Sequence, residues 1–376
     1  MTNRYSSQRI LLLAVSVLTI FGLLMVYSAS SVVASLKWGS SSYYVLRQVA
    51  YAAIGYFLMI LLMNVDYHVW GKKKTAVRLT VFSLVSLTLV FTQPVIKGAH
   101  RWLRFGNFLS FQPSELAKLV LLTCLALFLH KHELEIHRPG RPLLYCLLLV
   151  SSFVGLIGAE PDFGQALCLC FMAALMLFVA GLSWKYFATA TLVLIPTMSL
   201  VIWKVPYLWT RIQTYWDPSR ASLGAGWQIK QAKIAIGSGG FFGLGLGAGI
   251  QKLFFLPEPH GDFVFAVIGE ELGWIGTSLV ALTFLVYLFG GLRAACRAPD
   301  RFGFYLGLGI TLMIVLPSLV NMSMVLALLP TKGIALPFIS QGGTSLLLNL
   351  IATGILLNIS ISPREIEAEA DSASMA

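Results

Sequence analysis

The sequence predicts an all-α polytopic membrane protein with about ten transmembrane helices and a large extracytoplasmic loop between spans 7 and 8. Two observations support this prediction. The 376 residues are 57% hydrophobic and 11% charged, whereas roughly one-quarter of the residues of a soluble domain are charged. Segments such as 10–33 and 306–329 contain no acid or base, and a helix needs about 20 apolar residues to cross a bilayer.

Apolar runs of bilayer length place the spans along the chain. They cover residues 10–33, 44–64, 77–95, 114–130, 142–158, 163–181, 185–203, 263–290, 303–329 and 336–360. The first run is too long for a cleaved signal peptide and many spans follow it, so we expect it to be retained. Residues 1–362 then form one membrane domain, and the acidic tail 363–376 is expected to be disordered.

The net charge of +11 is explained by topology. Lysine and arginine gather in short loops such as 72–78, 131–141 and 293–301, as expected for segments that face the cytoplasm and its anionic lipids. This pattern predicts that both termini are cytoplasmic and that the segment 204–262 lies outside. Membrane lipids therefore account for the basic residues, and no nucleic acid is required as a partner. The five cysteines lack the paired spacing of zinc or redox sites.

The outside segments differ from the cytoplasmic loops because their charged residues lie among prolines, glycines and aromatic residues. Lys97 and Arg101 precede a predicted helix start that carries Glu115 in its first turn and Lys118 one helical step later. Glu115 and Lys118 could form a plain ion pair, and Arg101 could belong to an interfacial belt. The alternative is that Lys97, Arg101 and Lys118 bind a phosphate group.

Two further outside segments carry candidate residues. A short loop between spans 5 and 6 contains Asp162, which either caps the sixth span or belongs to a site. The long loop 204–262 contains Arg211, and a loop of that length without function is uncommon. Within it, residues 226–236 predict an amphipathic helix on the membrane. The glycine-rich run 237–249 is interpreted as a hinge whose amides could also contact a diphosphate.

The strongest candidate stretch is residues 256–265, in which Glu258, His260 and Asp262 precede a long apolar run. A carboxylate held beside lipid has a raised pKa and can act as a general base. The simpler interpretation is a polar span end that Asp262 caps. The segment 329–345 pairs proline with glycine, which indicates a broken or re-entrant helix. Lys332 would point into the cavity there, or snorkel to the surface.

Together these segments resemble the SEDS family (shape, elongation, division and sporulation), which includes FtsW, RodA and SpoVE. The matching stretches are Lys97-Gly-Ala-His-Arg-Trp-Leu, Phe111-Gln-Pro-Ser-Glu-Leu-Ala-Lys, Glu160-Pro-Asp-Phe-Gly, Gly226-Trp-Gln, Gly237-Ser-Gly-Gly, 256–273 and 330–343. The last two resemble the division branch, FtsW, more than the elongation branch, RodA. Four positions differ from the usual family pattern, and none removes an acid: Lys97, Gln165, Gly261 and Gln341.

The resemblance implies a peptidoglycan glycosyltransferase that polymerises lipid II into β-1,4 glycan strands for the septal cell wall. The family's essential aspartate falls on Asp262, which would be the general base of an inverting displacement that releases undecaprenyl diphosphate. The implied substrate-binding residues are Lys97, Arg101, Glu115, Lys118, Asp162, Arg211, Glu258, His260 and Lys332. The basic ones would neutralise the diphosphate, while Glu115 and Asp162 would either orient them or hold a divalent cation, Mg or Mn.

The same resemblance implies the surroundings of the protein. Its partners would be lipid II, the nascent glycan strand, a class B penicillin-binding protein that crosslinks the strands, and other division proteins. It would lie in the bacterial inner membrane at the division septum, with the active site facing outward.

Two other functions fit part of the pattern. A lipid II flippase or transporter would also have about ten spans, broken helices and buried charges. Its acids should lie near the middle of the bilayer, whereas here only Glu270 and Glu271 interrupt a span. A non-catalytic scaffold for the penicillin-binding protein is the second alternative, and for a scaffold Asp262 would be dispensable.

Overall fold

The computed structural model describes residues 6–94, 100–105, 109–133, 135–136, 140–217 and 225–361. In that part of the chain, ten apolar helices correspond one to one to the predicted spans: α1 (Ser6–Trp38), α2 (Tyr43–Met63), α4 (Lys73–Leu89), α5 (Pro113–His132), α6 (Arg141–Ala159), α7 (Phe163–Val179), α8 (Trp184–Lys204), α11 (Val264–Cys296), α12 (Arg301–Val325) and α13 (Gly343–Ile359). Eight are long and apolar enough to cross a membrane, and α7 and α13 are shorter. The prediction of an all-α polytopic membrane protein is confirmed.

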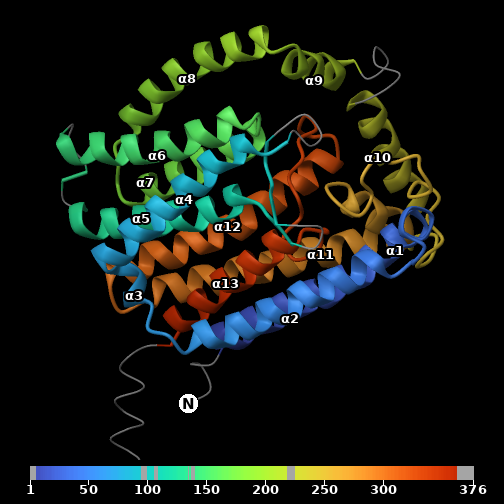
Figure 1. The fold of residues 1–376 in the computed structure, drawn as a ribbon, viewed down its shortest axis with the longest axis horizontal. Helices are drawn as coiled ribbons and strands as arrows, with labels where there is room; N and C mark the ends of the chain where they lie inside the picture. Colours follow the sequence, from blue (N-terminus) through green and yellow to red (C-terminus); the bar gives the residue numbers. More distant parts are fainter. Residues whose placement is uncertain are drawn as a thin grey trace, which may run out of the picture.

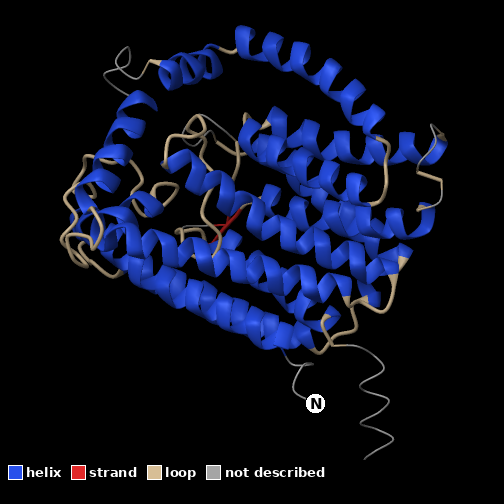
Figure 2. Ribbon diagram, turned by 180° about the vertical axis from the view of Figure 1, so that it is seen from behind, coloured by secondary structure: helices blue, strands red, loops and turns tan. Residues whose placement is uncertain are grey.

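The remaining elements are short. They are α3 (His68–Gly71), the 3-10 turn η1 (Val90–Thr92), the strands β1 (Leu103–Phe105) and β2 (Leu109–Phe111), α9 (Pro206–Trp216) and α10 (Ala225–Gly239). The two strands form an antiparallel hairpin, drawn in red in Figure 2, with Leu103 opposite Phe111. Helix α10 covers the predicted amphipathic helix 226–236. Helix α9 was not predicted.

The helices are packed unequally (Figure 1). Helices α5 and α12 are central and largely buried, α1 packs along α11, and α2 packs along α13. Helix α8 has the opposite character, because no residue of its most apolar window is buried. Together α8 and α9 form an arch that leaves the bundle and returns to it, as Figures 1 and 2 show from opposite sides. On α7, the side chains of Phe171 and Phe178 are exposed.

The tenth span begins later than predicted. The sequence placed its start at residue 336, but α13 begins at Gly343 and α12 already ends at Val325. The connection between them has no regular helix. Pro330 and Pro337 lack the amide hydrogen that a helix needs, and Gly342 precedes α13 in an extended conformation. The expected broken helix is thus an irregular segment that returns into the bundle.

Helix α11 is interrupted at Gly273, which has φ 64° and ψ −157°. The glycine-rich segment beginning at Gly240 fits into this break. The amide of Trp274 donates to the carbonyl oxygen of Gly240 at 3.0 Å, and the amide of Leu244 donates to that of Glu270 at 3.0 Å. A methyl group added to Gly243 would lie 2.2 Å from the carbonyl oxygen of Glu271, so the approach requires glycine. The segment interpreted as a hinge is held in place by α11.

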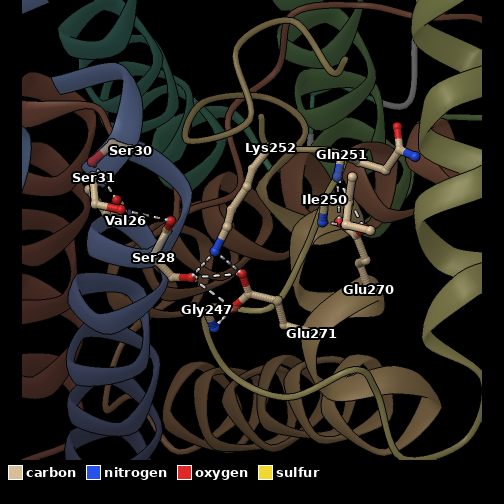
Figure 3. Close-up of polar contacts among 10 residues, drawn as sticks. All are labelled: Val26, Ser28, Ser30, Ser31, Gly247, Ile250, Gln251, Lys252, Glu270 and Glu271. Atoms are coloured by element: carbon tan, nitrogen blue, oxygen red, sulfur yellow. Dashed lines mark hydrogen bonds and ion pairs between the residues drawn. The ribbon is translucent and has the colours of Figure 1, made fainter. Parts of the chain in front are cut away.

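The two acids inside the eighth span hold the same segment by their side chains (Figure 3). Glu270 accepts hydrogen bonds from the amides of Ile250 at 2.8 Å and Gln251 at 3.1 Å. Glu271 accepts from the Lys252 ammonium at 2.6 Å and from the Ser28 hydroxyl of α1 at 2.7 Å. Glu271 and Lys252 are both buried. These carboxylates therefore attach the loop between α9 and α11 to α1 and α11.

We expect Lys252→Met to lower the stability of the protein strongly. The substitution leaves the Glu271 carboxylate buried without its cation, and breaking such a pair on one side costs about 3–5 kcal/mol. The double variant Lys252→Met with Glu271→Gln removes both charges and should recover part of the loss. Thermal unfolding in detergent measures both variants. A double variant no more stable than the single one would contradict this explanation.

Candidate functional site

Asp262 lies in the turn directly before α11, where it is half-buried. It does not cap α11, because the N-cap residue is Phe263 and no side chain makes the cap hydrogen bond. Its carboxylate faces Gly333 instead: a methyl group added to Gly333 would lie 2.8 Å from Oδ2 of Asp262. The structure thus brings residues 256–262 against the irregular segment before α13, and the interpretation of Asp262 as a helix cap is wrong.

Hydrogen bonds from two buried side chains join these segments. Asn321 of α12 donates through Nδ2 to the carbonyl oxygens of Asp262 at 2.8 Å and Ile334 at 2.7 Å. The Ser340 hydroxyl donates to the carbonyl oxygen of Gly261 at 2.8 Å. Neither side chain was singled out from the sequence. The available signal was a lone amide in an otherwise apolar span, since polar groups at that depth require partners.

His260 and Glu258 shape the loop that carries Asp262. The buried His260 ring stacks on Tyr44 of α2, with ring centroids 5.0 Å apart. Its Nε2 lies 4.0 Å from Oε2 of Glu258, whose side chain is exposed and whose φ is +53°. Their predicted contact with substrate stays a prediction.

Two ion pairs form a second cluster, at the outer ends of α5 and α7. Lys118 Nζ lies 2.8 Å from Glu115 Oε1, and Arg101 Nε lies 3.4 Å from Asp162 Oδ2. Gln165 connects the two pairs. Its side-chain Nε2 donates to Oε1 of Glu115 at 3.0 Å, and its backbone N–H donates to Oδ1 of Asp162 at 3.4 Å. The second bond confirms that Asp162 caps α7. Burial raises the pKa of the Asp162 carboxyl, and the Arg101 guanidinium opposes that rise.

Lys332 lies between this cluster and Asp262. It directly precedes Gly333, and a methyl group added to Gly164 of α7 would lie 3.3 Å from the Lys332 side chain. The Arg211 guanidinium of α9 donates to the carbonyl oxygen of Thr331. Burial lowers the pKa of the Lys332 ammonium, and Arg211 lowers it further. The structure therefore brings together every predicted basic residue that it describes, while Lys97 lies outside the described residues.

An apolar groove leads to Lys332. A cavity of about 240 Å³ is lined by Lys332 together with apolar residues of α7 and α12, among them Leu167 and Phe171. The same two residues line a larger apolar groove of about 490 Å³ between α7 and α8. A molecule with a long hydrocarbon chain and an anionic end matches this combination, because the chain can lie in the groove and the anion at Lys332 and Arg211.

In the second cluster, Lys118 and Gln165 both contact Oε1 of Glu115, whose Oε2 is buried without a hydrogen-bond partner, and Arg101 contacts Oδ2 of Asp162. Among the described residues, no group of three or more histidine, cysteine, aspartate or glutamate side chains could hold a metal ion. Each of these two carboxylates contacts a basic residue, as the predicted orienting role requires. A divalent cation in the reaction stays a prediction.

Glu160 is a buried acid that was not selected from the sequence, although it stands two residues before Asp162. Both of its carboxyl oxygens are buried without a hydrogen-bond partner. Burial raises the pKa of Glu160 to about 8, to which the Asp162 charge contributes while Arg101 opposes it. Glu160 is therefore largely protonated at neutral pH, next to the Arg101–Asp162 pair.

We expect the stability of the protein to fall as the pH rises from about 4.5 to about 8. In this range Glu160 loses its proton in the unfolded chain but keeps it in the folded protein. The free energy of unfolding falls by on the order of a few kcal/mol, since one pKa unit corresponds to about 1.4 kcal/mol. This loss is complete above the pKa of Glu160 in the folded protein. Glu160→Gln should flatten this dependence. Thermal unfolding of both proteins between pH 6 and pH 9 measures it, and parallel curves would contradict the assignment.

Comparison with known proteins finds one family and relatives that match this chain over most of its length. Residues 8–365 match the FtsW/RodA/SpoVE family model, described as cell cycle protein. A probable peptidoglycan glycosyltransferase FtsW of Geobacter sp. (strain M18) is 43% identical over 358 residues, which is 94% of this chain and 97% of the relative. Stage V sporulation protein E of Bacillus subtilis (strain 168) is 39% identical over 362 residues, 96% of this chain and 99% of the relative.

Solved structures show the same fold. A chain from a study of the structural coordination of polymerization and crosslinking by a peptidoglycan synthase complex superposes with a TM-score of 0.75 at 28% identity, covering 93% of this chain and 96% of that one. The crystal structure of the rod shape determining protein RodA of Thermus thermophilus gives a TM-score of 0.67 at 26% identity, with 93% and 95% covered.

Proposed function

The chain belongs to the FtsW/RodA/SpoVE family of cell cycle proteins, and from this premise we propose that it is a peptidoglycan glycosyltransferase that polymerises lipid II for the septal cell wall. The observation that carries the proposal is the position of Asp262. A half-buried carboxylate packs against the segment that holds Lys332, and Lys332 ends an apolar groove. A base, cations for a diphosphate and a place for a hydrocarbon chain are thus adjacent.

In the proposed reaction, Asp262 is the general base. It takes the proton from the GlcNAc 4-hydroxyl of one lipid-linked disaccharide as that oxygen bonds to the anomeric carbon of another. The bond from that carbon to the diphosphate breaks, and undecaprenyl diphosphate leaves with the electron pair. The configuration changes from α to β in a single displacement, so no glycosyl-enzyme intermediate is required. A positioned base contributes about 10²–10⁴-fold to such a rate.

The basic residues around Lys332 stabilise the leaving group in this proposal. Lys332 and Arg211 come from two segments that meet at Thr331, and no carboxylate is within ion-pair distance of Lys332 among the described residues. Lys118 and Arg101 are each engaged by a carboxylate, so they set the local charge, while the Gln165 side chain joins α7 to Glu115 of α5. Cations aimed at the developing negative charge lower the barrier most where water is excluded.

The transporter alternative is weakened by the acids inside the eighth span. In a transporter we would expect them to line a path across the bilayer. Glu270 and Glu271 are instead engaged by amides of the extracytoplasmic loop and by Lys252. The scaffold alternative gives no reason for a half-buried acid beside the basic groups.

The partner and the location follow from the same proposal. A relative of known structure comes from a study of a peptidoglycan synthase complex that coordinates polymerization and crosslinking. We therefore propose a class B penicillin-binding protein as the partner of this chain, with other division proteins at the septum. Both termini would be cytoplasmic and Asp262 would face outward.

The test is glycan polymerisation from lipid II in detergent by the purified protein with its partner. We expect polymer from the wild type and a rate at least about 100-fold lower from Asp262→Asn, because the amide cannot accept the proton. Asp66→Asn is the matched control, since Asp66 is an exposed carboxylate that pairs with His68 near α3, and it should polymerise at the wild-type rate.

Three results would contradict the proposal. Equal polymer from wild type and Asp262→Asn would remove Asp262 from the chemistry. No polymer from the wild type, together with lipid II crossing liposome membranes, would support a flippase. No polymer and no crossing, with the partner still bound, would support a scaffold.

A further inference from the structure

We infer that Asn321 is a positioning residue for the reaction: it holds Asp262 and the Lys332 segment in one fixed relation, and the missing side chain at Gly333 leaves room for the Asp262 carboxylate. The inference rests on the proposed function of the site. Neither residue was a candidate from the sequence, and Asn321 lies on α12, which contributes none of the charged residues proposed for catalysis or binding.

The hydrogen bonds of Asn321 join two distant parts of the chain. Its Nδ2 donates to the carbonyl oxygen of Asp262, 59 residues earlier, and to that of Ile334, 13 residues later. The side chain is fully buried. Both neighbouring groups are carbonyl oxygens, which only accept, so the nitrogen of the amide must face them. One NH₂ group therefore supplies both protons.

No side chain of similar size can replace this amide. Aspartate has no proton to donate when ionised, and leucine would leave two carbonyl oxygens buried without a donor. These hydrogen bonds hold the main chain at Asp262 and at Ile334, which lies two residues after Lys332. Asn321 thus fixes the main chain of the proposed base relative to the segment that carries the proposed cation, through bonds to carbonyl oxygens alone.

Gly333 leaves room for the carboxylate itself. A methyl group added there would lie 2.8 Å from Oδ2 of Asp262, which is too short for a real contact, so a side chain at this position would push against the carboxylate. Gly333 does not have a positive φ, so space rather than backbone conformation disfavours a side chain there. Asn321 therefore holds the main chain of Asp262, and the missing side chain at Gly333 leaves the space that the carboxylate occupies.

The consequence is a specific effect on the chemical step. We expect Asn321→Ala to lower kcat for polymerisation by roughly 10- to 100-fold, since a displacement of about 1 Å in a catalytic group can cost about 10²-fold. The KM for lipid II should change by less than about 3-fold, because the groove and the basic groups are untouched. The measurement is a rate curve over lipid II concentration on the complex with the partner.

Asn358→Ala is the matched control. Asn358 of α13 also joins separate segments, since it donates to the carbonyl oxygen of Met63 at 2.8 Å and accepts from the amide of Tyr67 at 2.9 Å. It lies at the other end of α13 from the site. This variant should lose comparable thermal stability and keep the wild-type kcat. Equal falls in kcat for the two variants would reduce Asn321 to a structural role.

Gly333→Ala is an independent variant that keeps every hydrogen bond of Asn321. We expect it to fold and to lower kcat at least 10-fold, again with little change in KM, by displacing the Asp262 carboxylate. Its control is Gly155→Ala on α6, where nothing lies within 4 Å of an added methyl group. This pair keeps the inference testable if Asn321→Ala does not fold.

The outcomes separate this inference from the proposed function. If the wild type polymerises, Asp262→Asn does not, and both Asn321→Ala and Gly333→Ala keep the wild-type kcat, the inference is wrong and the proposed function stands. If the wild type with its partner makes no polymer, both are overturned. If both variants lose kcat while their controls keep it, the positioning role is supported.

Discussion

The attachment of residues 240–252 to α11 is the interaction on which the arrangement of the site depends. Glu270 and Glu271 lie within an apolar span, where unsatisfied backbone and side-chain groups are costly. The break at Gly273 exposes carbonyl oxygens, and the amides of residues 244 and 245 satisfy them. The carboxylates then bind amides from Gly247 to Gln251. These contacts fix the chain a few residues before the stretch that ends at Asp262.

The site is the meeting point of that loop with the irregular segment between α12 and α13. A chain without helical hydrogen bonds is tolerated at this depth only where protein groups satisfy its backbone. Asn321, Ser340 and the chain around His260 supply them. The same contacts that make the irregular segment stable therefore set Asp262 beside Gly333, the residue after Lys332.

Charge is distributed in a way that suits a lipid-linked diphosphate. The acids at the ends of α5 and α7 are matched by Lys118 and Arg101. Lys332 lies near the Arg211 charge, and within the described part of the chain no carboxylate pairs with Lys332. Helix α8 leaves the bundle (Figure 1) and lines an apolar groove together with α7. A substrate could then enter from the membrane and bring its anionic end to the two basic residues.

The sequence by itself determined the class of the protein, the number of spans and most of the charged residues of the site. Hydrophobic runs of bilayer length are a local property, and charges beside proline and glycine mark span ends without knowledge of the fold. The family resemblance added the role expected of Asp262. The placement of Asn321, Gly333 and Glu160 was decided only by the tertiary structure. Their importance lies in contacts with residues distant in sequence, because a buried amide, a missing side chain and an unpartnered acid look ordinary until their neighbours are known.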